Sequence, residues 1–237
     1  MTPAHLDALV ALVGPAGLSV QDVGGRAAAV VAPADRDQCA AVLRWCHETR
    51  TPLGLPASAR DAGEPAPQLR LRIDRMQRLR AVSAADGQLV ADIGAPLATL
   101  QAAAAERGLA LPLTLTRTGA MTLGEALHAA AWGSAVLALE VVLPHGRIWQ
   151  GVADAQASAS SAALGALFLA GQGSLGVVTG VTLHLAPPEA AGPADRTGPV
   201  VPGPRPLAQP PVDDVALLAR IKRALDPNHL LDPGRWL

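Results

Sequence analysis

Histidine and cysteine are residue types whose spacing in this chain could indicate a zinc site or a redox pair. The six histidines include no His-x₃-His pair and the two cysteines form no Cys-x₂-Cys pair, so their spacing does not favour a zinc site. Cys39 and Cys46 lie seven residues apart in a stretch with helical periodicity. That separation is about 10 Å along a helix, which is too far for a disulfide. Val42 and Leu43 share the same face, so both thiols are predicted to be buried, and a reducing compartment is expected.

The sequence lacks the motifs that mark a catalytic serine or a phosphate-binding P-loop. Ser158, Ser160 and Ser161 lie in an alanine-rich segment without the Gly-x-Ser-x-Gly turn that exposes a catalytic hydroxyl. No Gly-x₄-Gly-Lys-Ser/Thr motif occurs in the sequence. Neither serine hydrolysis nor P-loop nucleotide hydrolysis is therefore expected.

The composition describes a chain that can bury a core of its own. Of its 237 residues, 50% are apolar and 16% are charged, which excludes a disordered tail and a collagen-like fibre. The net charge of −1 argues against a nucleic-acid or acidic-membrane partner. The densest basic stretch is interpreted as the solvated face of a strand that runs into a loop, because arginine alternates with apolar residues at 69–73. It contains no interleaved aromatic residues on which bases could stack. Its members are Arg70, Arg72, Arg75, Arg78 and Arg80.

Membrane and export signals are also missing from the sequence. The longest apolar stretch, residues 162–171, is too short to cross a bilayer. The first twenty residues contain no lysine or arginine, so they do not resemble a signal peptide. A cytoplasmic protein without a transmembrane segment is expected.

Hydrophobic periodicity and turn signals predict an α+β chain with two lobes, at about residues 27–78 and 79–186. Asp35 is a plausible N-cap of a helix over residues 36–48, and Gly108 is expected to end a helix that starts at Pro96. A hairpin turn is predicted at Asp86 and Gly87. Further helices are expected at 3–13, before Trp132 and before Gly171, and strands at 27–31, 52–56, 69–73, 89–93, 137–143, 147–152 and 179–185.

The composition changes abruptly after residue 186. Nine of the 21 prolines fall within residues 186–211, so residues 187–211 are predicted to be an extended linker. Beyond it, Asp213 is expected to cap a helix, within a C-terminal unit of residues 212–237. Apolar residues follow one face of this helix, so it should dock back onto the preceding domain.

Three segments of the sequence resemble motifs of one protein family. They read GQGSLGVVT at 171–179, LEVVLPHG at 139–146, and IKRALDP at 221–227 followed by LDPGR at 231–235. Together they resemble the FAD-linked oxidase superfamily, whose flavin domain is of the vanillyl-alcohol oxidase or p-cresol methylhydroxylase type. The segments are most similar to those of glycolate oxidase FAD-binding subunits. The resemblance implies a two-lobed FAD-binding domain over residues 1–186, with the C-terminal helix docking back after the linker.

The resemblance also implies a noncovalent FAD site made of loops with small residues, where backbone N–H groups can approach a diphosphate closely. No histidine lies in the first of these loops, which argues against a covalent histidyl–flavin bond. The second loop opens a helix whose N-terminus would favour an anion. The candidate cofactor-binding residues are Pro56, Ala57, Ser58, Ala59, Arg60 and Asp61; Gly119, Thr122, Leu123 and Gly124; and Gly171, Gly173, Ser174, Gly176 and Val177.

Several positions depart from the family pattern. Residues 57–59 read Ala-Ser-Ala where the family has glycines, and Glu125 places a carboxylate where a second glycine is expected. Ala130 replaces the family's asparagine, and the chain has no tyrosine. The proline linker stands where relatives have a substrate-binding cap domain of a hundred or more residues.

Two hypotheses remain open at this stage. The chain could be the FAD-binding subunit of a glycolate-oxidase-like flavoprotein oxidoreductase that acts on 2-hydroxy acids, with other oxidase subunits as partners. In that case it is truncated without the cap, is not catalytic alone, and has no assigned catalytic or metal-ligating residues. Alternatively, it could be a degenerate FAD-type domain without flavin that serves as a structural or regulatory subunit.

Overall fold

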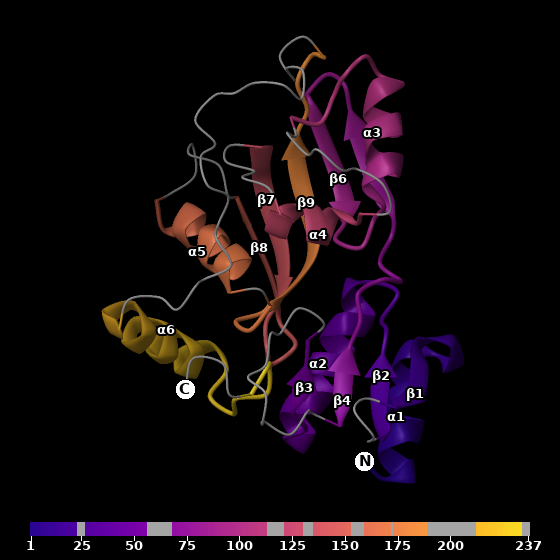
Figure 1. The fold of residues 1–237 in the computed structure, drawn as a ribbon, viewed down its shortest axis with the longest axis vertical. Helices are drawn as coiled ribbons and strands as arrows, with labels where there is room; N and C mark the ends of the chain where they lie inside the picture. The colour runs from indigo at the N-terminus through magenta and orange to yellow at the C-terminus, as the bar shows by residue number, and fades with distance from the viewer. Residues whose placement is uncertain are drawn as a thin grey trace.

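The computed structural model contains two β-sheets with helices packed on them (Figure 1). It describes residues 1–22, 27–55, 68–112, 121–129, 135–152, 159–171, 173–188 and 212–233. The predicted α+β class is confirmed. The proposed linker at 187–211 lies almost entirely outside the described residues, as do Ala130 and Trp132.

The first sheet, sheet A, has the strand order β1-β2-β4-β3. Strand β2 runs parallel to β4, β4 runs parallel to β3, and β1 pairs antiparallel with β2. Strand β1 was not expected, because most of its side chains are exposed and no buried run marks it in the sequence. The strands are β1 (Leu18–Asp22), β2 (Ala27–Val31), β3 (Leu53–Gly54) and β4 (Leu69–Leu71).

Helices α1 (Pro3–Val13) and α2 (Arg36–Thr49) accompany sheet A, with a 3₁₀ turn, η1, at Pro15–Gly17. The predicted cap of α2 is confirmed, since the Asp35 carboxylate accepts the Gln38 backbone N–H at 2.9 Å. Cys39 and Cys46 are both buried and free on the inner face of this helix. This lobe therefore has its own apolar core.

The second sheet, sheet B, is antiparallel throughout, in the order β5-β6-β9-β7-β8. Two hairpins, β5–β6 and β7–β8, are joined by β9, which pairs with an inner strand of each. Gly87 adopts a φ of 59° in the turn of the first hairpin, as its position predicts. The strands are β5 (Leu79–Ser83), β6 (Gln88–Asp92), β7 (Val136–Val142), β8 (Ile148–Val152) and β9 (Val177–His184), and the helices are α3 (Leu97–Ala105), α4 (Leu123–Ala129) and α5 (Ala159–Ala170).

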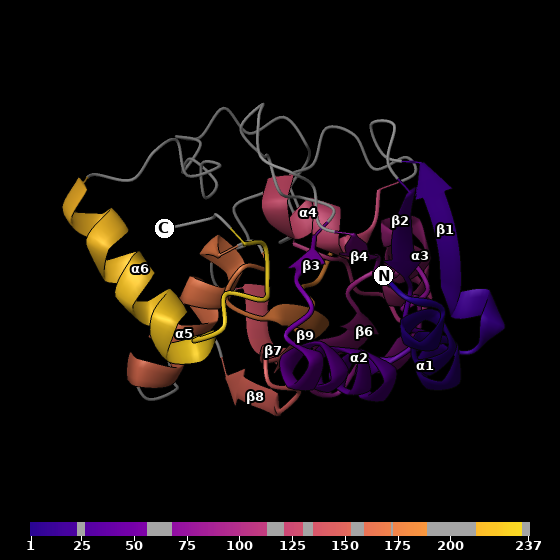
Figure 2. The same ribbon diagram turned by 90° about the horizontal axis from the view of Figure 1, so that it is seen from below.

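Helix α6 (Val212–Leu225) begins one residue before Asp213, which therefore lies in the first turn and is not the N-cap. After α6 the chain returns to sheet A (Figure 2). There Leu231 forms a parallel bridge with Leu53 of β3. The C-terminal segment thus docks onto the domain, as its apolar pattern predicts.

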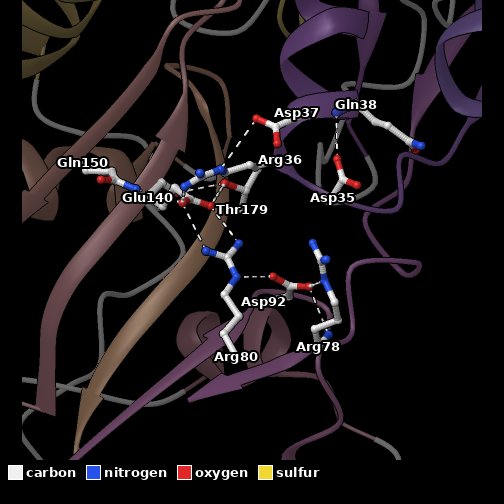
Figure 3. Close-up of polar contacts among 10 residues, drawn as sticks. All are labelled: Asp35, Arg36, Asp37, Gln38, Arg78, Arg80, Asp92, Glu140, Gln150 and Thr179. Atoms are coloured by element: carbon white, nitrogen blue, oxygen red, sulfur yellow. Dashed lines mark hydrogen bonds and ion pairs between the residues drawn. The ribbon is translucent and has the colours of Figure 1, made fainter. Parts of the chain in front are cut away.

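The arginine-rich stretch is not simply a solvated face. Arg75 donates to the backbone carbonyl of Ala32 at 2.8 Å. Arg80 binds two carboxylates, Asp92 at 2.6 Å and Glu140 at 2.8 Å (Figure 3). Arg36, at the start of α2, reaches the same Glu140 at 2.6 Å. This ion cluster connects the helix of the first lobe to the central strands of the second. Among the described helices, none is long and apolar enough to cross a membrane.

Candidate functional site

A cavity of about 590 Å³ lies where the edge of sheet A meets sheet B. Its volume is typical of a site for a small molecule or cofactor. Sheet A contributes Leu55 and Leu71, α4 and the turn before it contribute Thr122 and Gly124, and the start of β9 contributes Val177. The remaining lining residues are Arg72, Ile73, Asp74, Ile93, Gly94, Glu125, Leu127, Phe168, Leu169, Gly173 and Val178.

The lining is mostly apolar, and two of its glycines are packed against neighbouring parts of the wall. A Cβ on Gly94 would lie 2.4 Å from the Ile73 carbonyl oxygen, and one on Gly173 would lie 2.7 Å from Leu55 Cδ1. Gly173 also has a φ of 88°, which disfavours other residue types. At both positions an added side chain would overlap neighbouring protein atoms, so no larger residue fits unless those atoms move.

Asp74 gives this apolar cavity a polar anchor point. Its Oδ2 pairs with Arg72 at 2.5 Å, while its Oδ1 is buried and has no hydrogen-bond partner among the described residues. The Asp74 side chain as a whole is 46% exposed, so only this oxygen is shielded from solvent, and a ligand N–H or O–H group at the cavity would supply it with a donor.

The sequence-predicted residues divide into those at the cavity and those beside it. Thr122, Gly124, Gly173 and Val177 line the cavity. Leu123 is buried in the core of the second lobe. Gly171, Ser174 and Gly176 are buried but do not line the cavity, and they shape the turn that carries Gly173. Pro56, Ala57, Ser58, Ala59, Arg60, Asp61 and Gly119 lie outside the described residues.

The backbone at the start of α4 differs from the simple expectation of an anion-binding helix end. The Leu123 N–H donates to Ala95 at 2.8 Å and the Gly124 N–H donates to Ile93 at 2.7 Å. The Thr122 N–H donates to the Glu125 carboxylate at 2.8 Å, which forms a capping box. These three amides therefore already have acceptors, and Thr122 and Gly124 contribute surface to the cavity instead.

Glu125 remains at the cavity wall with its Oε2 held by Thr122. Its negative charge therefore stays beside the cavity, where it would repel a bound diphosphate, as its sequence position indicates. Sequence reasoning missed Leu71, Asp74, Gly94 and Phe168. The only signal for Asp74 was its place just after a predicted strand.

FAD can be tested against this cavity from the residues present. The apolar lining and the volume of about 590 Å³ suit a flat ring system. Asp74 Oδ1, which has no hydrogen-bond partner in the part of the chain that the structure describes, matches the hydroxyl and N–H donors that FAD carries. Within the described residues, no cluster of three His, Cys, Asp or Glu side chains could hold a metal. The described part of the site fits FAD.

Comparisons with known proteins agree with this fit. A profile of the family described as "FAD binding domain" matches residues 27–151. Over 184 residues the chain is 28% identical to the mitochondrial D-2-hydroxyglutarate dehydrogenase of Bos taurus, covering 72% of this chain and 34% of that protein. The chain thus spans about a third of the length of this curated relative.

Solved structures show the same fold. The chain resembles p-cresol methylhydroxylase with substrate bound, with a TM-score of 0.59 and 16% identity, covering 78% of this chain and 43% of that one. It also resembles alkyldihydroxyacetonephosphate synthase, with a TM-score of 0.63 and 14% identity, covering 79% and 41%. At these identities the similarity establishes the architecture and nothing finer.

Proposed function

This chain belongs to the family of FAD-binding domains, and we propose that it is the flavin-binding part of an oxidoreductase that acts on 2-hydroxy acids. The observation that carries the proposal is the cavity between the two sheets, with its apolar lining and its close-packed glycines. When bound there, FAD would supply the acceptor for the hydride removed from the substrate's alcohol carbon.

The chain's own residues would bind, orient and shield the cofactor. Leu55, Val177 and Phe168 would exclude water from the ring system, and Asp74 Oδ1 would accept a hydrogen bond from it. Candidate phosphate contacts come from Pro56–Asp61 and from the segment around Gly119. These roles follow from the family resemblance and from position in the chain.

Two sequence similarities support the substrate class. The motifs at 139–146, 171–179 and 221–235 are similar to those of glycolate oxidase FAD-binding subunits, and the curated bovine relative is named for another 2-hydroxy acid. The chain spans about a third of that relative's length. From the resemblance to FAD-binding subunits of glycolate oxidase, we propose that other oxidase subunits act together with this chain.

Flavin content tests the proposal directly. The protein is purified, denatured, and assayed for released flavin absorbance and fluorescence, and then titrated with FAD. Binding near one FAD per chain is expected. Stoichiometry far below one, both as purified and after titration, would overturn the proposal in favour of a degenerate domain without flavin.

Variants at Asp74 locate the cofactor in the cavity. Asp74→Ala removes the buried acceptor and should weaken FAD binding about tenfold, whereas Asp74→Asn keeps an acceptor oxygen and should weaken it less. Asp7→Ala, on the exposed face of α1, is the matched control. Equal affinity in all three variants would place the flavin elsewhere.

A further inference from the structure

Lys222 is the only lysine in a chain that otherwise uses arginine, and its side chain is 1% exposed. Its Nζ donates to the Ser174 carbonyl at 2.5 Å, to Asp226 Oδ2 at 2.7 Å and to the Leu231 carbonyl at 2.6 Å. We infer that Lys222 is a positioning residue that couples docking of the C-terminal segment to FAD binding. The inference rests on the proposed function.

One of these contacts reaches the glycine-rich turn. Ser174 follows Gly173, which lines the cavity, and its own hydroxyl donates to the Gly171 carbonyl at 2.7 Å. Lys222 therefore holds the main chain one residue away from the cavity wall. Through this bond, α6 fixes the turn that precedes β9.

The other contacts reach the edge of sheet A. Asp226 accepts the backbone N–H groups of Leu230 and Leu231 at 3.0 and 2.9 Å, which folds the chain after α6 into a tight turn. That turn pairs with β3, since the Leu53 N–H donates to Leu230 at 2.8 Å and the Asp232 N–H donates to Leu53 at 2.9 Å. Lys222 thus also fixes the strand that leads to Leu55.

The Ser174 contact and the contacts to the C-terminal turn both lead to the cavity, where the Leu55 side chain packs against Gly173. A closed chain of contacts therefore runs from Lys222 through the glycine-rich turn, across the cavity wall, and back through β3 and Leu231. Without Lys222, the C-terminal segment would no longer hold Leu55 and Gly173 in their relative positions.

The chemistry of lysine suits this position. A compact ammonium group directs three N–H donors at three oxygen atoms, whereas the planar guanidinium of arginine needs more room and a forked acceptor. Its charge is compensated by Asp226, which is fully buried. Because coupling between two sites is reciprocal, bound FAD should in turn hold the C-terminal segment in place.

The first test compares FAD dissociation constants, measured by quenching of flavin fluorescence, for the unmodified chain, Lys222→Met and Arg223→Met. Arg223 is the neighbouring exposed cation and provides the matched control. Lys222→Met should raise the dissociation constant about tenfold or more, and Arg223→Met should leave it within about twofold. A folded Lys222→Met protein that binds FAD as tightly as the unmodified chain would overturn the inference. Failure of the unmodified chain to bind FAD would instead refute the proposed function.

The second test needs no variant and therefore decides the matter if Lys222→Met does not fold. Hydrogen exchange is followed by mass spectrometry in the unmodified chain with and without saturating FAD. Peptides covering residues 226–232 should exchange more slowly with FAD, while those of α1 should not change. Protection at the cavity lining without any change at 226–232 would show that the C-terminal segment is only structural.

Discussion

Gly173 and Leu55 touch across the seam between the two sheets, where a Cβ on the glycine would lie 2.7 Å from Leu55 Cδ1. Leu55 follows β3 of sheet A, and Gly173 precedes β9 of sheet B. The contact closes one wall of the proposed flavin cavity. Both conformation and space therefore restrict position 173 to glycine.

Replacing Gly173 by alanine should weaken FAD binding about fivefold or more, because Leu55, which lines the cavity, must shift to make room for the added Cβ. It should also lower the free energy of unfolding by about 1–2 kcal/mol, because φ is positive. Gly108→Ala is a matched control, since Gly108 has a φ of 68° with nothing within 4 Å of the added Cβ. The control should lose stability and keep its FAD affinity. Equal loss of affinity in both variants would mean that strain alone is responsible.

Glu125→Gln should strengthen FAD binding a few fold at low ionic strength, because it removes a negative charge from the cavity wall. The glutamine oxygen can still accept the Thr122 N–H, so the capping box should largely survive. Titrations of FAD at low and high salt measure the effect. Glu106→Gln, at the exposed end of α3, is the control. Unchanged affinity at low salt would place the FAD diphosphate away from Glu125.

Glu140 should make the stability of the protein depend on acid pH. Burial alone would raise its pKa, but hydrogen bonds from Arg80, Arg36 and Thr179 lower it from 4.5 to about 2. The lowered pKa favours the folded state by about 3 kcal/mol above pH 5, and this stability is lost as the pH falls from about 4.5 to 2. Urea unfolding across this range checks the expectation. Glu140→Gln should remove this part of the pH dependence, and an identical profile in the variant would contradict it.

The two thiols should be unreactive in the folded protein. Burial raises the pKa of Cys46 to about 12 and raises the pKa of Cys39 as well, so little thiolate forms at neutral pH. A chromogenic disulfide reagent should react slowly with the native chain and should titrate two thiols after denaturation. A native thiol that reacts as fast as free cysteine would contradict the assignment of both to the core.

Much of the local structure is predictable because its signals lie close together in the sequence. Asp35 caps α2 through an amide three residues away, and Cys39 and Cys46 share the buried face that their spacing indicates. Glu140 shows the limit of such signals. Its sequence position predicts only a place in a strand, while its partners Arg36 and Arg80 lie 104 and 60 residues away.

The sequence by itself determined the α+β class, most helices and strands, the resemblance to FAD-linked oxidases, and the cavity residues Gly124 and Gly173. The class and the elements follow from periodicity, capping and turn chemistry, which act between near neighbours. Gly124 and Gly173 follow from the family resemblance. Only the tertiary structure decided that Leu123 enters the core, that Asp74 faces the cavity and that Lys222 joins the glycine-rich turn to β3. Those facts depend on how two sheets and a C-terminal segment pack, and contacts between distant parts of the chain leave no local pattern.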